Sequence, residues 1–188
     1  MLFAVGRPKK FDRESVLEKA LPVFWRCGFA DTSLHELEQA TGVNKSGLYS
    51  EFKGKEDLFV QSLRYYQDNL ELGELLAREP LGWDNIERLL KARSRDRQCL
   101  KGCFAVNSMR ETAILPREAI DILSEGRSKL RELIAKNIAA EKPGAKAHVL
   151  GEVVLTFFTG LRLEHNVSSS HAGFVREVDE FMKLMRKL

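Results

Sequence analysis

The stretch from Ser33 to Leu58 holds the densest set of local structure signals in this sequence. Ser33 and Glu36 form the S-x-x-E pattern that starts a helix, because each side chain can bind the other residue's backbone amide. Gly42 follows at the position where a turn between two helices needs a positive φ. Asn44 can then cap a second helix running from Lys45 to about Ser50. The segment therefore predicts two short helices joined by a tight turn, the helix-turn-helix arrangement.

Long segments of the chain repeat apolar residues at spacings of three and four, and sustained alternation of apolar and polar residues is absent. This periodicity predicts an all-α protein. A first helix should begin near Asp12 or Arg13 and end at Gly28, with a kink or loosened turn at Pro22. We expect a three-helix helix-turn-helix domain over residues 1–56 and a second helical domain over residues 57–188, a length that can bury a substantial core.

The polar residues of the segment gather at the start of its second helix. Lys45, Ser46 and Gly47 occupy the first turn, which is the part that enters the major groove when such a unit docks on DNA. Leu48 and Phe52 are spaced to hold the helix on the core. Short polar side chains and a glycine at this turn allow a nucleic-acid backbone or base edge to come close, so the pattern favours DNA binding.

Two further residues can bind phosphate. Tyr49 can pack its ring and still offer its hydroxyl, and Lys55 lies at the start of the next helix, where backbone amides also attract anions. A purely structural role is the alternative for part of the set: Ser33 and Asn44 are good helix caps, and Tyr49 and Phe52 are good core residues.

The spacing of these residues resembles the DNA-binding domain of the TetR family of transcriptional regulators. The resemblance covers about the first 60 positions and is carried by Gly28-Phe29, Thr32-Ser33, Ala40-Thr41-Gly42-Val43, Lys45-Ser46-Gly47-Leu48-Tyr49, Phe52 and Lys55-Glu56-Asp57-Leu58. It implies that phosphates are contacted by Thr32 or Ser33, Lys45, Tyr49 and Lys55, and that the residues nearest base edges are Asn44, Lys45, Ser46 and Gly47.

The same resemblance implies a cytoplasmic homodimeric repressor that binds a near-palindromic double-stranded operator. Its two recognition helices would lie roughly 34 to 36 Å apart, one turn of duplex. The helical second domain would bind an unknown small-molecule effector and form the dimer through its last two long helices. The apolar residues that we expect in this interface are Val154, Phe157, Phe158, Leu161, Phe174, Val178, Phe181 and Met185. A role in the protomer's own core is the alternative for both helices.

The three cysteines suggest a second possible trigger. Their odd number, without a secretory signal, fits a reducing cytoplasm. Cys103 opens an apolar helix close to Lys101, a setting that favours a thiolate. The alternative function is therefore a repressor that senses oxidants or electrophiles through Cys103, with Cys99. The plainer interpretation of Cys103 is a small buried hydrophobic residue.

Other classes of function find little support in the sequence. A basic run of Lys91, Arg93, Arg95, Arg97 and Lys101 could bind a phosphate-bearing effector, although a solvated helix end also explains it. Histidines at paired-ligand spacing, Gly-rich phosphate loops and nucleophile elbows are absent, so we expect no metal and no cofactor. An enzyme that uses the helical pocket is the third alternative, and the missing catalytic constellation argues against it, so we expect no enzymatic activity. The most apolar stretch, Val153 to Thr159, is too short to cross a membrane.

Overall fold

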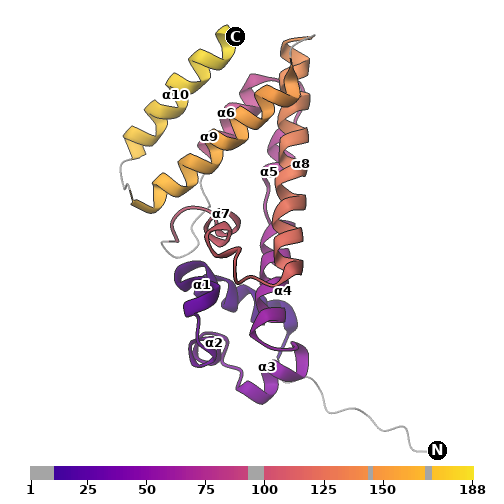
Figure 1. Ribbon diagram of the computed structural model, residues 1–188, viewed down its shortest axis with the longest axis vertical. Coiled ribbons are helices and arrows are strands. Elements are labelled where there is room, and N and C mark those ends of the chain that lie inside the picture. The colour runs from indigo at the N-terminus through magenta and orange to yellow at the C-terminus, as the bar shows by residue number, and fades with distance from the viewer. Residues whose placement is uncertain (1–10, 93–99, 144–145, 168–170) are drawn as a thin grey trace, which may run out of the picture.

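The computed structural model describes residues 11–92, 100–143, 146–167 and 171–188, and these residues form helices without a β-strand (Figure 1). The predicted all-α class is therefore confirmed. The elements are α1 (Arg13–Asp31), α2 (Leu34–Thr41), α3 (Lys45–Glu51), α4 (Lys55–Asp68), α5 (Leu72–Leu76), α6 (Trp83–Lys91), α7 (Phe104–Ser108), the 3₁₀ turn η1 (Met109–Glu111), α8 (Arg117–Glu141), α9 (Ala147–Val167) and α10 (His171–Lys187).

Helix α1 begins at Arg13, as the sequence predicts. Its irregular residue is Gly28 and not Pro22, where a kink was expected. Asp12 caps the helix by accepting a hydrogen bond from the amide of Ser15 at 3.0 Å. The helix continues through Pro22, which is half-exposed. The non-helical residue is Gly28, with φ 80° and ψ 177°. Residues 29–31 then form one more turn before α2 starts.

The first hydrophobic cluster joins the helix-turn-helix region to the second half of the chain. Phe59 of α4 packs its ring against Phe24 of α1 and against Phe104 of α7, with ring centroids 5.2 and 5.6 Å apart. Trp25 of α1 stacks on Phe104 at 6.0 Å. The cluster also takes in Ala119 and Ile122 from the first half of α8. The boundary expected at residue 56 remains a prediction, but the apolar packing is continuous across it.

A second cluster fills the space between α5, α6, α9, α10 and the later half of α8. Its helices are tied together by Asn137 of α8, a fully buried side chain. The Asn137 amide donates to the carbonyls of Leu76 and Leu133, and its oxygen accepts from Gly82 and Asn85 at 2.8 and 3.0 Å. All four hydrogen-bonding positions of this amide are thus used, as a buried polar group requires.

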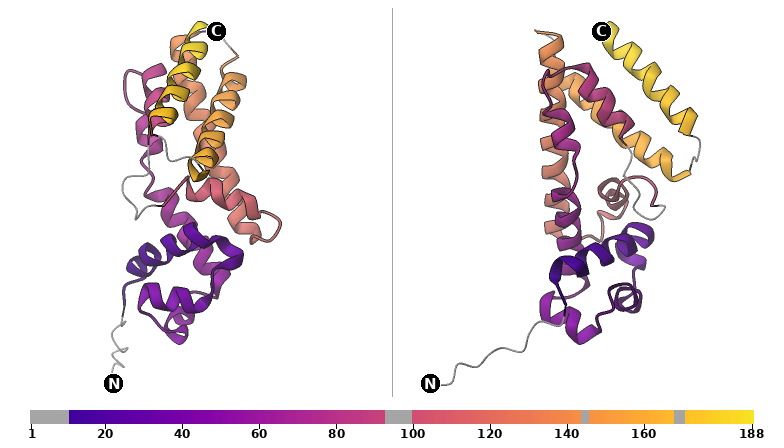
Figure 2. Two further views of the ribbon diagram at one scale, coloured as in Figure 1. Left: turned by 90° about the vertical axis from the view of Figure 1, so that its left-hand side faces the viewer. Right: turned by 180° about the vertical axis from the view of Figure 1, so that it is seen from behind.

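The arrangement places the α2–α3 unit at one end of the molecule and the long helices at the other. Helices α1, α2 and α3 form the lower end in Figure 1, and α8 rises from beside α4 toward the upper end, where α9 and α10 lie. The two other views show α9 and α10 on the outside of this upper part (Figure 2). Among the helices described, none is both long and apolar enough to cross a membrane.

Candidate functional site

The first turn of α3 is an exposed polar surface held on an apolar base. Leu48 and Phe52 are each 1% exposed and anchor the helix, while Asn44, Lys45 and Ser46 are exposed. Asn44 caps the helix by accepting from the amide of Gly47 at 2.9 Å. This geometry leaves the helix start exposed, and its contact with DNA remains a prediction.

Helix α2 is fixed by the capping box that the sequence indicates. The Ser33 hydroxyl accepts from the Glu36 amide at 3.2 Å, and the Glu36 carboxylate accepts from the Ser33 amide at 2.8 Å. The hydrogen bonds from the Ser33 amide and hydroxyl lower the pKa of Glu36, so the carboxylate stays ionised. Gly42 closes α2 with φ 71°, a conformation that favours glycine. These local contacts determine the angle at which α3 leaves α2.

Gly47 is needed for packing inside the unit. A Cβ atom at this position would lie 2.7 Å from Cγ1 of Val43 and 3.2 Å from the ring of Phe11. The absence of a side chain therefore lets the start of α3 approach the segment before it. The close approach of DNA to Gly47, which the sequence predicts, remains a prediction.

Lys45 and Tyr49 form an exposed pair one turn apart. The Lys45 ammonium lies 5.7 Å from the centroid of the Tyr49 ring, and the Tyr49 side chain is 44% exposed. The Lys45 amide donates to the carboxylate of Glu38 on α2, which holds the beginning of α3 in place. A cation and a phenol on one exposed face can both donate to phosphate oxygens.

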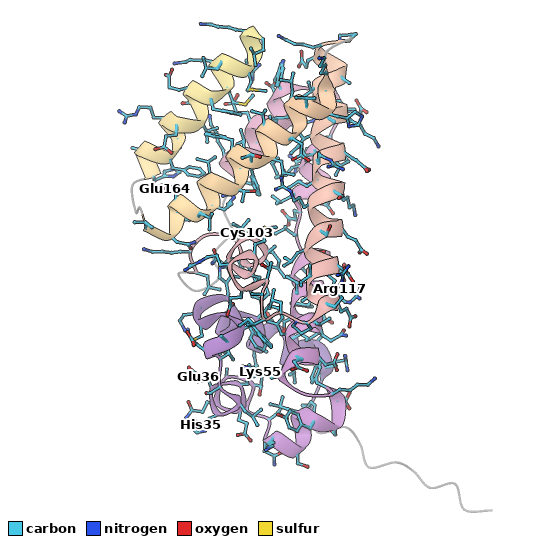
Figure 3. The ribbon with its side chains drawn as sticks, viewed as in Figure 1. His35, Glu36, Lys55, Cys103, Arg117 and Glu164 are labelled. Atoms are coloured by element: carbon cyan, nitrogen blue, oxygen red, sulfur yellow. The ribbon has the colours of Figure 1, made fainter. Side chains whose placement is uncertain are left out.

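Thr32 and Lys55 make internal hydrogen bonds in this structure. Thr32 is 2% exposed, and its hydroxyl donates to the carbonyl of Gly28 at 2.5 Å. The Lys55 ammonium donates to the carbonyls of Phe29, Ala30 and Thr32 at 2.9, 3.2 and 3.0 Å. Their expected phosphate contacts remain predictions, and the position of Lys55 inside the lower unit can be followed in Figure 3.

Cys103 lies in the wall between two cavities of about 800 and 210 Å³. Tyr66, Leu70, Leu72 and Phe158 line both cavities with it. Cys103 is 7% exposed, and its sulfur lies 3.2 Å from the Tyr66 hydroxyl in a hydrogen bond that either group can donate. Burial, and next the neighbouring Cys103, raise the pKa of Tyr66 well above its ordinary value, so the phenol stays neutral. Figure 3 shows Cys103 at the level of α7, between the lower unit and the upper helices.

A buried cation that sequence reasoning missed lines the larger cavity. Arg162 of α9 is 4% exposed, and its guanidinium donates to the carbonyls of Leu89 and Leu90 at the end of α6. The guanidinium also stacks on the ring of Phe158, 4.5 Å from the centroid. No local signal distinguishes Arg162 from the surface arginines, because the carbonyls that it binds are 73 and 72 residues away in the sequence.

The structure describes some of the remaining residues of the possible cysteine trigger and of the basic run, and leaves others out. Cys99, Arg93, Arg95 and Arg97 lie outside the described residues. Lys91 is paired with Glu87 and Asp179, both at 2.7 Å, so its charge is balanced within the protein. Across the described segments, no group of three or more acidic, histidine or cysteine side chains could hold a metal ion.

The expected dimer residues divide into two sets. Val154, Phe158, Leu161, Val178 and Met185 are at most 4% exposed and pack inside the protomer's second cluster. Phe157, Phe174 and Phe181 are only partly buried. The large apolar side chains that are exposed on α9 and α10 are Val149, Val153, Leu163, Val167 and Leu184, with Leu188 next to the end of α10.

Four of these exposed side chains, together with the half-buried Phe157 and Phe181, form two apolar rows. Val149, Val153 and Phe157 follow one another at helical spacing on α9. Phe181 and Leu184 do so on α10, and Leu188 follows directly after the end of that helix. The two rows meet where the rings of Phe157 and Phe181 stack, with centroids 3.8 Å apart. We call these six residues the α9–α10 apolar face. The sequence shows that both helices are apolar but does not indicate which rows face outward.

Comparison with known proteins agrees with this geometry. Residues 16–61 match the model of the family "Bacterial regulatory proteins, tetR family". The chain is 49% identical over 63 residues to the HTH-type transcriptional repressor ComR of Escherichia coli strain K12, and 30% identical over 110 residues to the uncharacterised HTH-type transcriptional regulator YezE of Bacillus subtilis strain 168. These alignments cover 34% and 55% of this chain, and they span 30% of ComR and 56% of YezE.

Solved structures match over nearly the whole chain. A cysteine mutant of the TetR-family regulator CifR, in complex with 26-base-pair double-stranded operator DNA, is 26% identical with a TM-score of 0.81, and the match covers 94% of this chain and 98% of that one. The reduced form of Escherichia coli NemR is 19% identical with a TM-score of 0.76, covers 94% and 95%, and shows a shared fold. The family model and these relatives confirm the resemblance seen in the sequence. Residues 16–61 therefore form a domain of the tetR family of bacterial regulatory proteins, and the chain as a whole shares the fold of TetR-family structures.

Proposed function

We propose that this protein is a cytoplasmic repressor that binds double-stranded operator DNA through the first turn of α3. The observation that carries the proposal is the exposure of Asn44, Lys45 and Ser46 on a helix anchored by the buried Leu48 and Phe52. CifR, the relative in complex with operator DNA, supports a duplex as the partner, and ComR is named a repressor. The protein acts by binding, without catalysis or a cofactor.

The active form is a homodimer joined through the α9–α10 apolar face. Leu184 and Val153 are 64% and 46% exposed, and a run of such side chains is stabilised when a second copy covers it. The helix pairs of two protomers would then form a four-helix bundle. Such a dimer presents two α3 helices to successive turns of a near-palindromic duplex.

A small-molecule effector bound in the cavities around Tyr66 and Cys103 releases the operator. Their volumes, about 800 and 210 Å³, are sufficient for a small organic ligand. The larger cavity offers Arg162 and an apolar wall, so it can hold a molecule with both polar and apolar parts. The effector shifts the dimer toward a conformer with another spacing of the α3 helices, to the extent that it binds this conformer more tightly.

The function is tested by selecting duplexes from a random double-stranded pool with the purified protein. We expect enrichment of an inverted repeat whose half-sites lie about one helical turn apart, and protection of both half-sites in a footprint. The deletion of one half-site should lower affinity by several orders of magnitude. A pool that stays random after repeated selection would contradict the proposed function.

A second candidate mechanism is release of the operator by covalent modification of Cys103. The observation that favours it is the position of the Cys103 sulfur in the shared wall of both cavities, hydrogen-bonded to Tyr66. A neutral Tyr66 hydroxyl can donate to a thiolate and so stabilise the nucleophile. With N-ethylmaleimide, the sulfur would form a bond to one alkene carbon, the π bond would break, and the thiol proton would end on the adjacent carbon.

Treatment with N-ethylmaleimide should therefore release the selected duplex from the wild-type protein and leave Cys103→Ser bound. The added group is larger than the thiol and has to displace the side chains of the cavity wall. Cys27→Ser is the matched control, because Cys27 is a half-buried thiol on α1 that lines neither of these cavities. Release that persists in Cys103→Ser would exclude this mechanism.

A further inference from the structure

The last turn of α1, which follows the non-helical Gly28, leads through Thr32 into α2. Its backbone is bound by a side chain from far along the chain. The Glu111 carboxylate of η1 accepts from the amide of Phe29 at 2.7 Å and from the amide of Ala30 at 2.8 Å. These hydrogen bonds join residues more than 80 positions apart. Gly28 makes room for them, since a Cβ atom there would lie 2.7 Å from the Glu111 carboxylate.

The carbonyls of the same segment are bound by a second charged side chain. The Lys55 ammonium of α4 donates to the carbonyls of Phe29, Ala30 and Thr32, and it lies 4.8 Å from the centroid of the Phe29 ring. We call Glu111, Lys55 and the backbone of residues 29–32 the interdomain clamp. One charge holds the amides and the opposite charge holds the carbonyls, so both edges of this turn are fixed by charge-assisted hydrogen bonds.

Few residues separate the interdomain clamp from Cys103 in the cavity wall at one end and from α2 at the other. Cys103 lines both cavities, and η1 with Glu111 follows it after the five residues of α7. Trp25 ties the same region to α1, because its indole nitrogen donates to the carbonyl of Lys101 at 2.8 Å. At the other end, Thr32 is followed directly by Ser33, the capping residue of α2.

A carboxylate suits this position for a chemical reason. Its two oxygens can accept from two amides at once, and its charge strengthens both hydrogen bonds. A glutamine in the same place would turn an NH₂ group toward one of the two amide donors. The Glu111→Gln change therefore removes half of the clamp's amide side without changing the size of the residue.

We infer that Glu111 is a positioning residue for DNA recognition, through which the second domain fixes the orientation of α2 and α3. The inference rests on the proposed function. In this proposal Glu111 acts through the backbone amides of Phe29 and Ala30, to which its carboxylate is hydrogen-bonded, and not through a contact with DNA. Displacement of α7 and η1 by a ligand at the cavity wall would move Glu111 and release the turn that leads into α2.

The test compares Glu111→Gln and Glu111→Ala with Glu118→Gln. Glu118 is the matched control, because it is a 56% exposed carboxylate on α8 that forms a salt bridge to Arg64 of α4, and such surface pairs contribute little. We expect hydrogen exchange at the amides of Phe29 and Ala30 to become at least about tenfold faster in both Glu111 variants. A cavity of about 700 Å³ between α1 and α7 is lined by Gly28 and Glu111, so water reaches this site.

Both Glu111 variants should also bind the selected duplex about tenfold more weakly than Glu118→Gln does. The dependence of affinity on salt should keep the wild-type slope, because no phosphate contact is lost. Stoichiometric titration gives the fraction of active protein, which separates weaker binding from partial unfolding. Wild-type affinity in both Glu111 variants would overturn the inference, whereas a wild-type protein that binds no duplex would overturn the proposed function instead.

Discussion

Replacement of Lys45 by glutamate should weaken binding of the selected duplex about a hundredfold. The Lys45 ammonium lies on the exposed first turn of α3, beside Tyr49, where it can donate to a phosphate or to a base edge. The change removes this contact, worth about 1–3 kcal/mol, and places a carboxylate against the negatively charged duplex. Affinity should also depend less on salt. The slope of the logarithm of affinity against the logarithm of salt concentration should become less negative by about one unit.

The same change should leave the folded state almost unaltered. Lys45 is exposed, and an acidic residue in the first turn of a helix interacts favourably with the helix dipole, so the free energy of unfolding should change by less than about 0.5 kcal/mol. Lys136→Glu on the exposed side of α8 is the matched control, with the same change of charge far from α3. Equal affinities of Lys45→Glu and Lys136→Glu would show that α3 does not read the DNA as proposed.

Replacement of Leu184 or Val153 by glutamate should convert the dimer into a monomer. Both residues belong to the α9–α10 apolar face, and each dimer would have to bury two new carboxylates there. Burial of an unpaired carboxylate costs at least several kcal/mol, so the dimer dissociation constant should rise by about a thousandfold or more. Sedimentation equilibrium at micromolar concentration measures the mass, and a monomer should also lose most of its affinity for the two-half-site duplex.

Ile114→Glu is the matched control for these variants, because Ile114 is a 54% exposed apolar residue in the segment before α8. It should remain dimeric. Phe158 is unsuitable for this test, since it is 3% exposed inside the protomer core and a polar group there would unfold the protein. A dimeric mass for both Leu184→Glu and Val153→Glu would place the interface elsewhere.

The local parts of the site could be predicted because their signals lie within a few residues of each other. The capping box of Ser33 and Glu36, the positive φ of Gly42 and the cap at Asn44 each depend on contacts along one turn of chain. Leu48 and Phe52 face the core for the same reason, since helical spacing determines which residues share a face. The start of α3 can therefore be predicted from the sequence alone.

Capping residues and helical spacing do not predict interactions between residues that are distant in the sequence. Lys55 is spaced as a phosphate contact would be, yet its ammonium binds three carbonyls that lie at least 23 positions earlier in the chain. Glu111 had no pattern to mark it, because its two amide partners are brought to it only by the packing of α7 on α1. Arg162 is buried for a similar reason.

The amino-acid sequence by itself determined the helices, the helix-turn-helix and the polar first turn of α3, since periodicity and capping act locally. Only the tertiary structure decided which apolar rows of α9 and α10 are buried. Val153 and Val154 are neighbours with equal hydrophobicity, but Val154 is fully buried in the protomer while Val153 is 46% exposed. The direction in which a helix turns its apolar faces depends on the helices packed against it, and that packing involves the whole chain.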